Sequence, residues 1–308
     1  MYWTTKSDAC IVLPVLLVAP LPQGTPLKSD TESHCGVTCM ASMKQQLLGD
    51  CSIGYSGGMD STSVAYMAAI QEKGCVHLHT LNHGFGYPFN NWALRPVKDL
   101  QKVLGEDTVK HRFVNTNDLF KQVAARSFLK DKKEYGQGFG CCLGCTMSLI
   151  TKILIYNLER GIPHLFFGSS VGGEYAVMSM PVTVERLQAF CARYGVLYAP
   201  PLLDGHIEKD AERELLDNAG IFRGYRFLDK HSFGNQGYCL LSLQHLPDVL
   251  LNVHPTYSPE QVGRFFDDKV DICHRYIAKH FEAEGRDVDA AVAALSAITG
   301  SELESPKS

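Results

Sequence analysis

The chain has 308 residues, of which 45% are hydrophobic and 20% are charged, so it can bury a substantial core in one large domain or in one domain with a smaller appendage. Its net charge of −4 argues against a globally basic nucleic-acid binder. The 11 cysteines have no framework spacing, which indicates reduced thiols or metal ligands rather than disulfides, and a cytoplasmic location.

A short apolar run lies near the start of the chain, at residues 11–20 (IVLPVLLVAP). Its length suits the apolar region of a signal peptide, and it also suits a buried docking strand. The strand is favoured because only Lys6 precedes the run, Asp8 lies close to it, Pro14 interrupts it and no small-residue cleavage motif follows it. The run is too short to cross a bilayer as a helix, so we expect no membrane partner.

Residues 51–168 alternate between apolar runs that are typical of buried strands and longer runs that are typical of helices. Strands are predicted at 51–56, 75–80, 109–115 and 164–168, and helices at 61–73, 95–104, 118–133 and 147–160. Asn117 is predicted to be the N-cap of the third helix. Strands separated by helices are typical of a doubly wound parallel α/β sheet, in which ligands bind beyond the carboxyl ends of the strands.

The pattern divides the chain into three parts. Residues 1–50 are predicted to be an N-terminal extension, and 51–200 to be the α/β domain. After Pro200 the rhythm changes, and residues 201–308 are predicted to be a mainly helical C-terminal region. Cys191 and Cys273 fall within helical patterns and are predicted to be buried apolar residues.

The segment SGGMDS, at residues 56–61, joins the first predicted strand to the first predicted helix. Gly57 and Gly58 allow backbone conformations that other residues disfavour, so successive N–H groups can point into one concavity. The following helix adds the positive end of its dipole, and these features together suit a pyrophosphate group. Asp60 is placed to bind Mg²⁺ or to hold the loop amides. The simpler alternative is a plain glycine turn in which Asp60 and Ser61 cap the helix.

SGGMDS matches the SGG-x-D-S signature of the PP-loop ATP pyrophosphatases, the N-type adenine-nucleotide α-hydrolases, and the strand–helix pattern resembles that superfamily over about residues 51–200. The resemblance implies ATP and Mg²⁺ as cofactors, attack of a substrate oxygen on the α-phosphorus and release of pyrophosphate. It also assigns roles within the loop, to the cofactor-binding residues Ser56, Gly57 and Gly58 and to Asp60 and Ser61, which serve in both binding and catalysis.

The same resemblance extends to two other strand ends. The nucleotide base of these enzymes lies over the end of the second strand, which here points to Thr80 and Asn82, whereas His83 is expected to be a packed loop histidine. The loop after the fourth strand approaches the α-phosphate, which here points to Gly168 and Ser169. Sulfur-inserting relatives carry an Asp-rich pattern in that loop, whereas this chain has serine, glycine and glutamate there.

A cysteine-rich segment, CCLGC, is predicted to be a loop between two helices. Cys142 and Cys145 form a C-x-x-C pair, a spacing at which two thiolates can face one ion, and the pair suits an iron–sulfur cluster, zinc or a redox disulfide. Cys239, in a second glycine-containing segment, is the best candidate for a third ligand, and Cys141 can replace Cys142 in the pattern.

This arrangement resembles the tRNA 2-thiocytidine and 2-thiouridine synthetases of the PP-loop superfamily. The resemblance implies a [4Fe–4S] cluster on Cys142, Cys145 and Cys239, with one iron open to a sulfide that attacks the activated carbon. It places Cys142 and Cys239 among the catalytic residues. Zinc is the alternative metal.

Two rival functions stay open. Residues 125–169 also resemble the N-acetyl sugar amidotransferases, which take ammonia from a glutaminase partner, although Cys35 and Cys39 match that family's N-terminal cysteine motif poorly. The other rival is a non-catalytic nucleotide-binding module.

The expected protein partner depends on which atom the enzyme inserts into its substrate. Sulfur insertion implies a cysteine desulfurase as donor, and nitrogen insertion implies a glutaminase subunit. The acceptor is a small molecule or a nucleobase; tRNA stays open, but the negative charge and the lack of an appended RNA-binding module do not favour it. The sequence also leaves a homodimer open.

Overall fold

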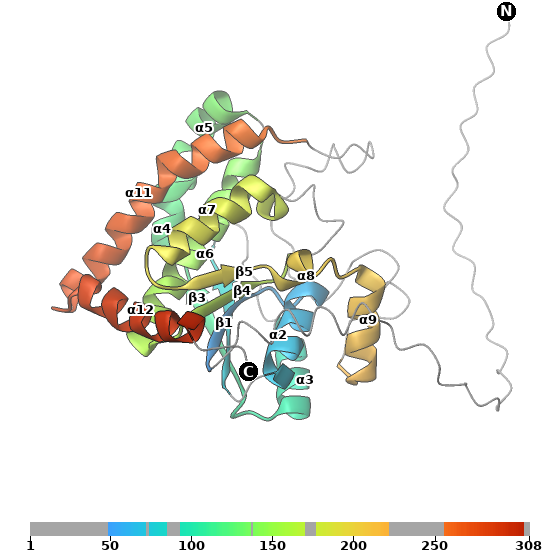
Figure 1. The fold of residues 1–308 in the computed structure, drawn as a ribbon. Coiled ribbons are helices and arrows are strands. Elements are labelled where there is room, and N and C mark those ends of the chain that lie inside the picture. The colour runs from blue at the N-terminus through green and yellow to red at the C-terminus, as the bar shows by residue number, and fades with distance from the viewer. Residues whose placement is uncertain are drawn as a thin grey trace, which may run out of the picture. The chain divides into compact units, whose positions relative to one another are not determined.

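The computed structural model describes residues 49–71, 74–84, 93–136, 138–169, 177–221 and 256–304. The apolar run 11–20 and Cys239 lie outside these residues. Five parallel strands form one sheet in the order β3-β2-β1-β4-β5 (Figure 1). The strands are β1 (Cys51–Tyr55), β2 (Val76–Asn82), β3 (Val109–Asn115), β4 (His164–Phe167) and β5 (Leu197–Ala199).

The central strand β1 is buried along its whole length. Ile53 pairs with Leu78 of β2 on one side and with Phe166 of β4 on the other. A continuous apolar strand of this kind is typical of parallel sheets that helices cover on both faces. The chain moves outward from β1 to β3, returns to β4 beside β1 and ends at β5, so the sheet is doubly wound as predicted.

Helices cover both faces of the sheet (Figure 1). Their bounds are α2 (Met59–Gln71), α3 (Leu94–Leu104), α4 (Asn117–Val123), α5 (Phe128–Tyr135), α6 (Phe139–Arg160), α7 (Pro181–Ala192), α8 (Pro201–Asp204), α9 (Lys209–Asn218), α11 (Pro259–Ala283) and α12 (Val288–Glu304). One apolar core joins α2, α3 and α9 to the sheet, and a second core joins α6, α7 and α11 to it.

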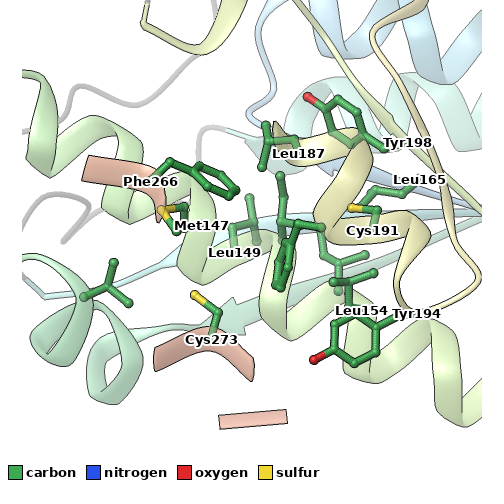
Figure 2. Packing of buried hydrophobic residues seen from close by; sticks show 14 of the residues in the cluster. Met147, Leu149, Leu154, Leu165, Leu187, Cys191, Tyr194, Tyr198, Phe266 and Cys273 are labelled. Carbon is green, nitrogen blue, oxygen red and sulfur yellow. The ribbon is translucent and has the colours of Figure 1, made fainter. Parts of the chain in front are cut away.

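The second core is the larger one, and Figure 2 shows part of it. Met147 of α6, Leu187 of α7 and Phe266 of α11 belong to it together with Leu165 of β4. The helix α11 therefore shares a core with the central helix α6. Its docking is reinforced by a buried ion pair, in which Lys269 Nζ lies 2.9 Å from Asp131 Oδ1 of α5. Cys191 and Cys273 are fully buried in the same core, as predicted.

The cysteine segment is helical, and the prediction of a loop is wrong. The helix α6 begins at Phe139, so the CCLGC segment occupies its first two turns. Gly144 in this segment and Gly140 just before it permit close packing. A Cβ on Gly144 would come within 2.7 Å of the Ala124 Cβ, and a Cβ on Gly140 would come within 3.1 Å of the Phe265 ring. Helix packing therefore explains these two glycines.

The predicted helix at 118–133 is two helices, α4 and α5, joined by the 3₁₀ turn η2 (Ala125–Ser127). Ala124 leaves the helical conformation, with φ of −129° and ψ of −50°. The bend lets Val123 and Ala124 pack against Gly144 of α6. Asn117 is the first residue of α4 and Thr116 is the N-cap, so that part of the prediction is also wrong.

Among the described residues, α6 alone has the length and apolar composition of a membrane span. Its most apolar stretch has a mean hydropathy of 1.6, and 72% of that stretch is buried inside the fold. The apolar character of α6 is accounted for by its place between the sheet and α11.

The buried His164 makes a pH-dependent contribution to stability. Burial lowers the pKa of His164 to about 4, below the 6.5 of an exposed histidine. Between these values the unfolded chain binds a proton that the folded chain does not, so the free energy of unfolding falls as the pH drops from about 6.5 to 4. Over that range we expect urea titrations to show wild type losing about 3 kcal/mol more than His164→Leu. Equal losses in the two proteins would contradict this assignment.

Candidate functional site

The SGGMDS loop lies at the carboxyl end of β1, between β1 and α2. The neighbours of β1 are β2 and β4, from which the chain runs in opposite directions across the sheet, so the loop lies at the topological switch point. Open α/β sheets bind their ligands at such points. Gly57 has a φ of +79°, in the left-handed region that a glycine adopts without strain. The loop therefore has the position and the backbone that anion binding requires.

The hydroxyl groups of the loop hold it in shape. The Gly58 N–H donates to Ser56 Oγ at 3.2 Å, and Ser56 Oγ lies 3.2 Å from Ser61 Oγ. Ser61 Oγ and Thr62 Oγ1 donate to the Gly58 carbonyl at 3.2 Å and 2.8 Å. One of the predicted anion-binding amides is thus satisfied by Ser56. A phosphate that takes the Gly58 N–H must displace this hydroxyl, which rotation about the Ser56 side chain permits.

The end of β4 packs directly against the loop. A Cβ on Gly168 would lie 2.5 Å from Ser61 N and 2.8 Å from Ser61 Cα, closer than real Cβ contacts come. Ser169, the next residue, is buried. The predicted site residue Gly168 therefore packs against the SGGMDS loop, and the absence of a side chain is what allows this contact.

We expect Gly168→Ala to lower the free energy of unfolding by about 1–3 kcal/mol, because the backbone of Ser61 must shift to admit the new methyl group. The ATP binding that the sequence resemblance implies should weaken by about tenfold or more for the same reason. Equilibrium dialysis and urea titration measure the two effects. Gly84→Ala is the matched control, since the nearest atom to its Cβ would be Asn117 Oδ1 at 3.9 Å. Unchanged ATP affinity in Gly168→Ala would show that this contact does not shape the site.

Asp60, in the first turn of α2, meets two charged residues of α9. Lys209 Nζ forms an ion pair with Asp60 Oδ1 and lies 3.4 Å from Glu212 Oε1. The Glu212 side chain is fully buried. Burial, followed by the charge of Asp60, raises the pKa of Glu212 to about 8, against the opposite effect of Lys209. The sequence analysis missed Lys209 and Glu212; their i, i+3 spacing on a helix was the only signal for them.

The two residues predicted to contact the nucleotide base differ in their exposure to solvent. Thr80 is buried, and its Oγ1 lies 2.9 Å from His111 Nε2 of β3. Asn82, at the end of β2, is exposed, and its carbonyl accepts a hydrogen bond from the Thr116 N–H at 3.1 Å. Of the two side chains, only that of Asn82 is available to a ligand at the carboxyl edge of the sheet.

His83 is packed, as expected, and it also contacts the cysteine segment. It follows β2, is fully buried and stacks on Phe120, with ring centroids 4.6 Å apart. Its Nε2 lies 3.4 Å from Cys145 Sγ. Burial lowers the pKa of His83 to about 4. Since β2 is the neighbour of β1, this contact brings the cysteine helix to the edge of the sheet that carries the SGGMDS loop.

The predicted metal ligands Cys142 and Cys145 belong to the same helix. They lie one helical turn apart on α6, and both are half-buried. Thiolates beside an imidazole suit zinc or iron. In the described part of the chain, however, no three ligand atoms from Cys, His, Asp or Glu at this edge lie within 4.8 Å of one another. The group that does meet this distance is Glu159, His280 and Glu284, on α6 and the end of α11.

No protein-family model matches the sequence, and no curated protein does. The solved structures to which the chain is similar include the three described next, each covered over most of its length. A U34-tRNA thiolase NcsA from Methanococcus maripaludis, with its [4Fe-4S] cluster, is 17% identical over 77% of this chain and 80% of its own, with a TM-score of 0.41. A predicted subunit of tRNA methyltransferase from Methanocaldococcus jannaschii is 17% identical over 69% and 91%, with a TM-score of 0.37.

The third structure is an NMN synthetase from Francisella tularensis, which is 13% identical over 78% of this chain and 92% of its own, with a TM-score of 0.40. The doubly wound sheet of this chain and the SGGMDS loop at the end of its central strand agree with the resemblance to the PP-loop ATP pyrophosphatases.

Proposed function

We propose that this protein is an enzyme that uses ATP to adenylylate an oxygen atom of its substrate, releases pyrophosphate, and then replaces that oxygen with sulfur. The observation that supports the adenylylation step is the position of the SGGMDS loop. It lies between β1 and α2 at the switch point of the sheet, with Gly168 packed against it. The chain thus has a glycine loop and a helix N-terminus where a nucleotide phosphate is expected.

In the first step, the substrate oxygen attacks the α-phosphorus and the bond to the β-phosphate breaks, so pyrophosphate leaves and the oxygen carries AMP. Ser56, Ser61 and the first N–H groups of α2 stabilise the negative charge that builds on the phosphates. Asp60 would hold Mg²⁺, which supplies further charge neutralisation when it is bound. In the second step, a sulfur nucleophile attacks the activated carbon and AMP departs with the original oxygen.

The support for sulfur comes from the cysteine helix. Cys145 lies against His83, at the end of the strand next to the phosphate loop, so an activated substrate and a sulfur carrier can meet at one edge of the sheet. Cys142, Cys145 and Cys239 would hold a [4Fe–4S] cluster, and Cys239 lies outside the described residues. When bound, such a cluster supplies an iron atom that holds sulfide. Zinc on the same cysteines is the alternative.

The test uses the full chain purified without oxygen, with ATP and fractionated pools of cellular small molecules and RNA as acceptors. Pyrophosphate release is measured with radiolabelled sulfide, with ammonium and with glutamine. Label transfer from sulfide to an acceptor supports the proposal. Release that depends on ammonium, without label transfer, would establish the amidotransferase instead. Tight ATP binding with no pyrophosphate release from any pool would leave a nucleotide-binding module.

A further inference from the structure

The contact between α9 and the start of α2 places an unusual charge group beside the phosphate loop. It consists of two carboxylates, from Asp60 and Glu212, and one ammonium, from Lys209. The ammonium lies between the carboxylates, paired with Asp60 and 3.4 Å from Glu212 Oε1. When both carboxyl groups are ionised, the group carries one unbalanced negative charge.

Glu212 is the member that the protein's own contacts satisfy least. Its side chain has no exposed surface, and neither carboxylate oxygen makes a well-directed hydrogen bond within the described part of the chain. The 3.4 Å approach of Lys209 is an ion-pair contact without hydrogen-bond geometry. A buried carboxylate without hydrogen bonds is destabilising, because it loses its hydration and gains little in exchange. A leucine at this position of α9 would fold with less difficulty, so a binding role accounts for the glutamate.

A divalent cation satisfies this group better than a lysine does. Two carboxylates match the charge of one divalent ion, whereas they exceed the charge of one ammonium. Magnesium in proteins is commonly held by one or two carboxylates, with water and substrate phosphates completing its shell. Asp60 lies in the first turn of α2 and keeps 30% of its side-chain surface accessible, so an ion bound to it can also contact a phosphate.

Lys209 can leave this position at low cost. It is the first residue of α9, where the positive end of the helix dipole disfavours a cation. Its side chain is 41% exposed, so the ammonium has access to solvent. A released ammonium would stay within reach of the phosphate loop.

We propose that Asp60 and Glu212 form a divalent-cation site next to the phosphate loop, and that Lys209 occupies the place of the cation until one binds. Binding of the cation by the two carboxylates does not depend on the proposed function. Only the sharing of that cation with the phosphates of ATP rests on it. Asp60 and Glu212 bind the ion directly, and Lys209 competes with it.

The experiment titrates Mn²⁺ into the full chain without nucleotide and follows the loss of the free-ion signal in electron paramagnetic resonance. Wild type is expected to bind the ion, and Glu212→Gln to bind it about tenfold more weakly or worse. Lys209→Met is expected to bind it several-fold more tightly, because the competing ammonium is gone. A misfolded variant cannot produce that gain. Glu214→Gln, an exposed change of the same charge on the same helix, should match wild type.

Three outcomes would overturn the proposal: no Mn²⁺ binding by wild type, unchanged binding by Glu212→Gln, or weaker binding by Lys209→Met. ATP binding in the presence of a chelator is measured in parallel, since it tests the phosphate loop without the cation. If the protein binds Mn²⁺ but does not bind ATP, the proposed function is refuted and the cation site is supported. The reverse pattern would remove the cation site alone.

Discussion

Asp60→Asn is expected to reduce AMP and pyrophosphate formation by about a hundredfold or more. The amide keeps the shape of the carboxylate but loses its charge, so it should not hold the proposed Mg²⁺ ion against the phosphates. The variant should keep its fold. Removing the Asp60 charge relieves its repulsion of the buried Glu212, and Lys209 stays paired with Glu212. Thin-layer separation of labelled ATP and AMP measures the effect, and urea titration checks the fold.

The matched control for this change is Asp210→Asn. Asp210 lies on α9 beside Lys209, is 90% exposed and pairs with Arg213 of its own helix, so it loses the same charge without touching the loop. Its AMP formation should equal that of wild type. Undiminished AMP release by Asp60→Asn would remove the SGGMDS loop from the mechanism, and the adenylylation proposal with it.

Cys145→Ser should lower the metal content of anaerobically purified protein by about tenfold or more, because the proposed three-cysteine centre would lose the ligand that contacts His83. Iron, sulfide and zinc analysis on the same samples identifies the metal. Sulfur transfer should be lost with the metal. ATP binding should persist, since the loop is built by β1, α2 and β4 rather than by α6.

Cys75→Ser is the control for this second change. Cys75 is half-buried, as Cys145 is, but it lies just before β2, at the opposite edge of the sheet from His83. Its metal content should match that of wild type. A metal-free wild-type protein with full sulfur transfer would refute the cysteine centre, and a metal-free protein that uses ammonium would favour the amidotransferase.

The strands and the SGGMDS loop could be predicted from the sequence because local patterns determine them. The apolar run CSIGY, two glycines and a helical pattern after them give β1, the loop and α2 without reference to any distant residue. The third strand was predicted with its observed bounds, 109–115. Alternation of strands and helices also predicts a parallel sheet, because parallel neighbours need a long crossover, usually a helix. The return of the chain from β3 to β4, beside β1, does not follow from that alternation.

Predictions from local patterns fail where a residue is constrained by packing against a residue distant in the sequence. The cysteine segment was predicted to be a loop, but it is helical, and Gly140 and Gly144 allow Phe265 and Ala124 to pack closely onto α6. Gly168 is likewise explained only by its approach to Ser61. In each case the missing Cβ makes room for another part of the chain, which a single-sequence pattern does not reveal.

The amino-acid sequence by itself thus determined the parallel sheet, the glycine loop at its centre and the cysteines that are candidate metal ligands. The tertiary structure alone decided which side chains meet there. Lys209 reaches Asp60 across a sequence separation of 149 residues, and Cys145 reaches His83 across 62. The physical reason is that secondary structure follows from local backbone preference and apolar period, whereas these contacts depend on how whole helices pack onto the sheet.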